Sequence, residues 1–100
     1  MAGRIETYTH SDSTTENKGA IIVKVTTTTD FAARTDVFKA FARRVAMLAY
    51  GALRMRKYIA AADVWPMVIE KFPELETERQ QVERELREPV TVSDVALLRL

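Results

Sequence analysis

Two segments between residues 3 and 29 have side chains that alternate in character with a period of two. In GRIETYTH, Ile5 and two threonines alternate with charged and aromatic residues. In AIIVKVTTTT, the apolar residues Ile21, Val23 and Val25 fall on one face. Both segments are rich in strand-forming residues, and the polar stretch SDSTTENKG between them has the composition of a hairpin loop. We therefore predict a β-hairpin over residues 3 to 29.

The period then changes to that of a helix. Apolar residues recur at helical spacing at Val37, Phe38, Phe41, Val45, Leu48 and Ala49. Thr35 or Asp36 is suited to cap this segment, and Gly51 is suited to end it. We predict a main amphipathic helix over residues 35 to 50 that covers the apolar face of the sheet. Burying the rings of Phe38 and Phe41 should each stabilise the fold by about 1.5–3 kcal/mol.

Two further helices and a strand are predicted in the second half of the chain. Asp63 can cap a short helix that tolerates Pro66 in its first turn and stops at Phe72-Pro73. The segment ELETERQQVERELRE has a thin apolar stripe and Arg–Glu spacings of four, which indicate a polar helix before Pro89. We thus predict two helices over residues 63 to 88 and a closing strand over residues 90 to 98. Residues 52 to 62 fit either a continued helix or a basic connection.

These elements predict an α+β fold. The expected order is β-β-α-α-α-β, with a small three-stranded antiparallel sheet that carries the helices on one face. A chain of 100 residues has room for one domain, in which about two-thirds of the unfolded surface is buried. We expect residues 1 to 100 to form that single domain.

Composition excludes several classes of function. The formal net charge is only +1, so bulk electrostatics require neither nucleic acid nor an anionic membrane. There is no cysteine, which excludes disulfides and thiolate sites and is consistent with a reducing cytoplasm. No apolar run approaches the roughly 20 residues that span a bilayer, and the N-terminus resembles neither a signal peptide nor a transit peptide. We expect a cytoplasmic protein without membrane association.

Residues that could support catalysis or metal binding are few. The three glycines do not form a phosphate-binding loop, and the single histidine, His10, lies near a strand end without a histidine or cysteine partner. The glutamates between Glu74 and Glu88 alternate with arginines, as in a solvated helix face. We expect no enzyme activity, no catalytic residues, no metal and no cofactor.

A basic segment offers one candidate binding site. It contains Arg43, Arg44, Arg54, Arg56 and Lys57, with two tyrosines beside them. Such a set could contact RNA phosphates and stack on bases. An RNA- or ribosome-associated protein is therefore one alternative, although the near-neutral charge of the chain weakens it.

Asp30-Phe31 stands where the hairpin gives way to the helix. One interpretation is that Asp30 caps a first helical turn and Phe31 folds inward as a hydrophobic staple. The other is that the aromatic ring is exposed for a partner. The residues of the corner alone leave both open.

The segment GAIIVKVTTTTDFAARTDVFKAFARRVAMLAYGA resembles the core of bacterial elongation factor Ts. That family has an apolar strand, then Thr-Asp-Phe-Val-Ala, and then a helix with paired phenylalanines. Here the motif is Thr29-Asp30-Phe31-Ala32-Ala33-Arg34, followed by Phe38 and Phe41. The similarity extends to the preceding strand, to the Glu-rich helix and to the closing strand, and is weakest over residues 52 to 65.

The resemblance implies a partner and a site. In the family, this half-core binds the GTPase elongation factor Tu, and the aromatic ring inserts between helices of its nucleotide-binding domain, which accelerates GDP release. It therefore implies that Phe31 inserts, that Asp30 makes the adjoining polar contact, and that Thr29, Ala32 and Arg34 complete the partner-binding set.

Two departures from the family pattern affect these expectations. Ala32 stands where the family usually has valine, and the family's N-terminal helical domain and second half-core have no counterpart in this sequence. We expect a half-core that stands alone, with a homodimer as a further implied partner, since short members of the family dimerise through this core. A homodimeric module without GTPase binding is the remaining alternative.

Overall fold

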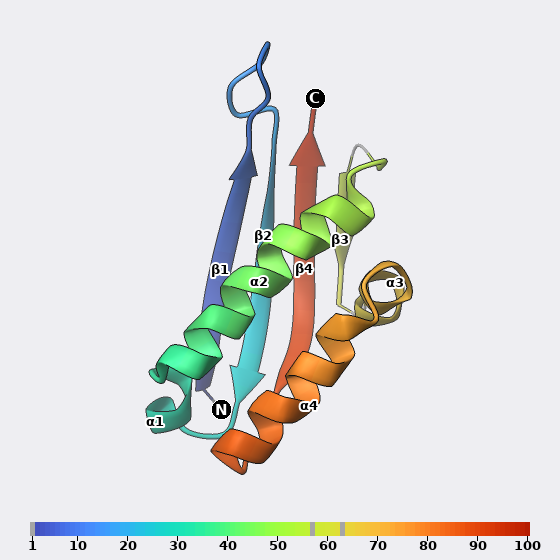
Figure 1. Cartoon of the computed structure of the whole chain (residues 1–100). Helices are drawn as coiled ribbons and strands as arrows, with labels where there is room; N and C mark the ends of the chain where they lie inside the picture. Colours follow the sequence, from blue (N-terminus) through green and yellow to red (C-terminus); the bar gives the residue numbers. More distant parts are fainter. Residues whose placement is uncertain (1, 57, 63) are drawn as a thin grey trace.

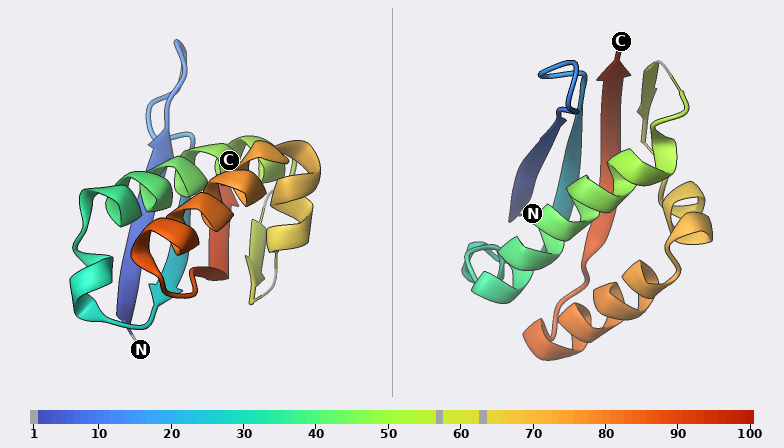
Figure 2. Two further views of the ribbon diagram at one scale, coloured as in Figure 1. Left: turned by 60° about the horizontal axis from the view of Figure 1, so that its bottom comes forward. Right: turned by 45° about the horizontal axis from the view of Figure 1, so that its top comes forward.

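A four-stranded antiparallel sheet in the order β1-β2-β4-β3 forms the base of the fold. The computed structural model describes residues 2–56, 58–62 and 64–100, and Figure 1 shows their arrangement. The chain runs through β1 (Ala2–His10), β2 (Gly19–Thr27), α1 (Asp30–Ala33), α2 (Asp36–Leu53), β3 (Tyr58–Ala61), α3 (Trp65–Lys71), α4 (Glu74–Leu86) and β4 (Thr91–Arg99). The α+β class is thus present, and α2, α3 and α4 lie on the same side of the sheet (Figures 1 and 2).

The hairpin forms as the alternation predicts. Strands β1 and β2 pair from Ala2↔Thr27 to His10↔Gly19, and Ile21, Val23 and Val25 are fully buried beneath the helices. Helix α2 packs over β1 and β2, and its Phe38 and Phe41 are buried in the same core as the strand residues. The apolar face of the hairpin and the apolar face of α2 therefore pack together in one core.

The predicted order of three strands and three helices is wrong by one strand, β3, and by the short helix α1. Residues Tyr58–Ala61 form β3, which pairs with β4 from Tyr58↔Leu98 to Ala61↔Val95. Four residues that include two alanines carry a weak strand signal, and the pairing depends on β4, which lies far along the chain. In this region α2 ends at Leu53, residues 54–56 form a turn, and Tyr58–Ala61 form an edge strand.

Helix boundaries differ from prediction for identifiable reasons. Thr35 caps α2 by accepting from the N–H of Phe38, but the helix continues through Gly51 to Leu53 because Leu53 is buried in the core. Pro66 lies in the first turn of α3, as expected, while the predicted cap Asp63 is outside the described residues. Helix α4 ends before Pro89, where Arg87 adopts a left-handed conformation with φ 57°.

Strand β4 lies between β2 and β3 and contains an irregularity. The register shifts between Lys24 and Val25, so that Lys24 pairs with Asp94 but Val25 pairs with Val92. Strand β4 therefore has one residue more than β2 at this point, between Val92 and Asp94. The added residue brings Val92 and Val95 onto the same buried face, although their spacing in a regular strand would place them on opposite faces. Within the described residues, no helix is both long and apolar enough to cross a membrane.

Candidate functional site

Residues 29–34, hereafter the Asp-Phe corner, connect β2 to α2. Thr29 caps the short helix α1, because its hydroxyl accepts a hydrogen bond from the N–H of Ala32 at 3.2 Å. The N–H of Arg34 closes the turn by donating to the carbonyls of Asp30 and Phe31 at 3.1 and 3.2 Å. The corner is therefore an ordered helical turn.

The two sides of this turn have different environments. Ala32 and Ala33 are only 2% and 8% exposed and pack into the fold, whereas the Phe31 side chain is 83% exposed. At about 100° per residue, Asp30, Phe31 and Arg34 fall on the side opposite to the two alanines. This exposure excludes the inward staple within the chain and presents the ring to solvent.

One member of the expected partner-binding set is placed differently. Thr29, Asp30, Phe31 and Arg34 are exposed, but Ala32 lies in the interior. Ala32 supports the corner from inside, where contact with a partner is sterically blocked. Because Ala32 is buried, the size of its side chain affects packing inside the fold, and this is where the difference from the family's usual valine acts.

The arginines of the expected basic patch are divided between the middle of α2 and the turn that follows its C-terminus. The Arg44 Nε bonds both carboxylate oxygens of Glu78 at 2.8 Å, an ion pair that raises the pKa of Arg44 and satisfies much of its charge. Arg54 lies about 16 Å along the helix axis from Arg43, given 1.5 Å per residue. Arg56 follows the helix end, and Lys57 is outside the described residues. The four arginines of this set that the structure describes do not form one cluster.

Arg54 instead joins a basic and aromatic pocket that the sequence did not indicate. The pocket, of about 180 Å³, is lined by His10, Lys18, Tyr50, Arg54, Met55 and Arg99. The rings of His10 and Tyr50 stack at 5.1 Å, and the Tyr8 hydroxyl lies 3.0 Å from His10 Nδ1. Alternation placed Tyr8 and His10 on one face of their strand, but only the pairing of strands and helix brings them to Tyr50. Among the described residues, no group of histidine and acidic side chains is arranged to hold a metal ion.

A second surface is the face of the sheet that no helix covers. Ile5, Ile22, Leu98 and Tyr58 are between 47% and 69% exposed there. Register places Ala20 beside Leu98 and Leu98 beside Tyr58, with Ile22, Ala96 and Ala60 in the adjacent row. We call these residues the open sheet face.

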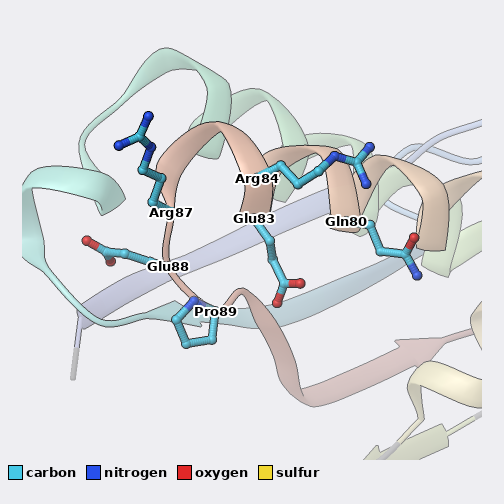
Figure 3. A pocket seen from close by; sticks show the side chains of 6 residues that line it. All are labelled: Gln80, Glu83, Arg84, Arg87, Glu88 and Pro89. Carbon is cyan, nitrogen blue, oxygen red and sulfur yellow. The ribbon is translucent and has the colours of Figure 1, made fainter.

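Glu88 is the residue near the corner that the sequence interpretation missed. It was grouped with the solvated glutamates of α4, but its carboxylate lies against Thr27, Thr28 and Thr29 at the end of β2. It also lines a broad depression of about 510 Å³ with Gln80, Glu83, Arg84, Arg87 and Pro89 (Figure 3). Its position just beyond the helix end and before a proline was the only available sign of a different role.

No protein-family model matches the chain. The geometry of the corner therefore carries the functional argument, together with the resemblance of its sequence.

Proposed function

We propose that the chain is a member of the elongation factor Ts family that binds elongation factor Tu through the Asp-Phe corner and promotes GDP release. The observation that supports this most strongly is the 83% exposure of Phe31 on an ordered turn. Exposed aromatic rings on rigid supports are frequent interface hot spots, because they lose little rotamer entropy on binding. A partner in translation implies a cytoplasmic location.

The exchange mechanism follows from linkage. A factor that binds the nucleotide-free GTPase more tightly than the GDP form must weaken GDP binding by the same factor. Insertion of the Phe31 ring between helices near the nucleotide would provide the differential contact. Exposed Asp30 and Arg34 lie beside the ring and are available for polar contacts around it.

The rate of labelled-GDP release from elongation factor Tu tests the proposal. We expect the chain to accelerate release and Phe31→Ala to weaken binding by at least about 2 kcal/mol, or roughly 30-fold. Stability of the isolated chain should change by less than about 0.5 kcal/mol, because the ring is exposed.

Met55→Ala is the matched control for this experiment. Met55 is also exposed, at 82%, but it follows the opposite end of α2. Met55→Ala should accelerate GDP release as much as the unmodified chain does. Absence of detectable binding by the unmodified chain contradicts the proposal, whereas binding without acceleration indicates that the chain sequesters the GTPase. Steep weakening of binding with salt would favour the RNA-binding alternative, since phosphate contacts release counterions.

The open sheet face supports a second candidate, self-association. Its residues are apolar side chains with alanines between larger ones, and the Lys24–Asp94 ion pair lies on the same face of the sheet. The apolar rows suit contact with a second copy. The Asp-Phe corner and the open sheet face do not share residues. A homodimer and a GTPase complex are therefore compatible proposals.

A further inference from the structure

The Glu88 carboxylate receives four hydrogen bonds from three consecutive residues at the end of β2. Its Oε1 accepts from the Thr27 hydroxyl at 2.9 Å, the Thr28 N–H at 3.1 Å and the Thr29 N–H at 2.9 Å. Its Oε2 accepts from the Thr29 hydroxyl at 2.6 Å. One side chain from just beyond the end of α4 thus fixes the backbone that leads into the Asp-Phe corner.

The Thr29 hydroxyl connects this carboxylate to α1. Its proton is directed at Glu88, which leaves its oxygen free to accept from the N–H of Ala32. A hydroxyl rotor normally samples several orientations, but the carboxylate here selects the one that caps the helix. The orientation of the turn that carries Phe31 therefore depends on Glu88.

We propose that Glu88 is a positioning residue that holds the Asp-Phe corner in the geometry that binds the GTPase. This inference rests on the proposed function for its partner, but its structural part is independent of that function. Glu88 acts on the partner through Thr27, Thr28 and Thr29. Fixing the corner before binding avoids the entropy loss of ordering it in the complex.

The ionised form of the side chain is what the site requires. Three donors converge on one oxygen, and a fourth donor meets the other, an arrangement that a carboxylate accepts fully. A glutamine retains one acceptor oxygen, but its NH₂ group would face the Thr29 hydroxyl and compete with the capping orientation. The same bonds, the one from the Thr29 hydroxyl foremost, lower the pKa of Glu88 below its ordinary value.

The chain reversal after α4 brings Glu88 to the corner. Helix α4 ends at Leu86, and the left-handed backbone of Arg87 then redirects the chain. In Figure 3 the Glu88 side chain points toward the ribbon of α1 and its connection to β2, while the Glu83 side chain points elsewhere. Glu83 instead accepts from the N–H of Val90 at 2.9 Å, so the two glutamates hold different segments.

Amide hydrogen exchange and GDP release together test this role in the full chain. The N–H groups of Thr28 and Thr29 donate to Glu88, so we expect Glu88→Ala to accelerate their exchange at least tenfold. Glu88→Ala should also raise, at least tenfold, the concentration of the chain that gives half-maximal acceleration of GDP release. The maximal rate of GDP release at saturating chain should change little. Glu88→Gln should give smaller changes of the same kind, and it provides the test if the alanine variant does not fold.

Glu85→Ala is the matched control, because Glu85 is an exposed acid one turn earlier on α4. It should alter neither measurement. Unchanged amide exchange at Thr28 and Thr29 in both Glu88 variants overturns the proposal, even where GDP release falls, since Glu88 would then act by direct contact. If the unmodified chain does not bind elongation factor Tu, the proposed function fails, and amide exchange alone decides whether Glu88 positions the corner.

Discussion

Two residues near Glu88 reduce the stability of the isolated chain. Phe31 leaves its ring in water and forgoes the roughly 1.5–3 kcal/mol that burial would contribute. Arg87 adopts φ 57°, a conformation in which the side chain of an L-residue meets the following carbonyl. Both residues adjoin the connection between the Asp-Phe corner and the end of α4.

Arg87→Gly should stabilise the chain by about 0.5–1 kcal/mol. Glycine adopts the left-handed conformation without steric conflict, although it gains entropy in the unfolded state. The free energy of unfolding in urea measures the effect. Arg84→Gly is the control, since a glycine inside α4 should destabilise by about 1 kcal/mol. A loss of stability in Arg87→Gly would show that the arginine side chain contributes more than its backbone conformation costs.

The corner could be predicted from sequence because its signals are local. Thr29, Asp30 and Phe31 follow a β-branched run directly and precede a helical pattern, so their place at a strand-to-helix junction depends on neighbouring residues alone. Glu88 could not be assigned in this way. Its hydrogen-bond partners lie 59 to 61 residues earlier in the chain. Glu88 is also a glutamate like the exposed glutamates of α4, so residue type alone does not distinguish it from them.

Among the elements, the loop between β1 and β2 is held by another carboxylate. Asp12 Oδ1 accepts from the N–H groups of Thr14 and Thr15 at 2.9 and 2.7 Å, and Oδ2 accepts from Lys18 Nζ at 3.1 Å. The backbone hydrogen bonds from Thr14 and Thr15, followed by that from Lys18, lower the pKa of Asp12. The loop therefore has a defined conformation while Asp12 is ionised.

Acid should loosen this loop only after the pH falls below the ordinary pKa of an aspartate side chain. Because the folded pKa is depressed, the stabilisation is fully present above the unfolded pKa and is lost as the pH falls through the folded pKa. Amide chemical shifts of Thr14 and Thr15 during an acid titration measure this. Asp12→Asn should remove the transition. A midpoint at the usual aspartate value would contradict the hydrogen bonds described.

Strand β3 and the register of β4 mark where element prediction reached its limit, although the closing strand itself was predicted over residues 90 to 98 and is observed at Thr91–Arg99. The alternation in VTVSDVALL breaks between Val92 and Val95, and only the shifted pairing with β2 explains how both become buried. Strand β3 has few β-branched residues, and its extended conformation depends on antiparallel pairing with the edge of β4. By contrast, β1, β2 and α2 carry long regular patterns, which made them predictable.

At the scale of the molecule, the one-sided placement of the helices leaves the open sheet face unpaired. A stable dimer typically buries about 800 Å² on each partner. The rows that contain Ile22, Leu98 and Tyr58 supply apolar side chains across β2, β4 and β3. This face is therefore the surface that we propose for contact with a second copy.

Ile22→Lys tests self-association through this face. Ile22 is 47% exposed in a central strand, so a lysine is tolerated in the monomer but introduces an unpaired charge into an interface. Sedimentation equilibrium should give a dimer for the unmodified chain and a monomer for Ile22→Lys. Phe31→Ala should remain dimeric, because its position is separate. A monomeric unmodified chain at high concentration would refute the second candidate.

The position of β4 has a consequence for how the chain is made. This strand comprises Thr91–Arg99, yet it lies between β2 and β3 in the sheet. During synthesis from the N-terminus, the hairpin and all the helices emerge before the strand that joins the two parts of the sheet. Until then, the inner edge of β2 has no neighbour and β3 has nothing to pair with. The nascent chain thus exposes an unpaired strand edge until β4 itself has been made, and during this interval that edge is open to aggregation.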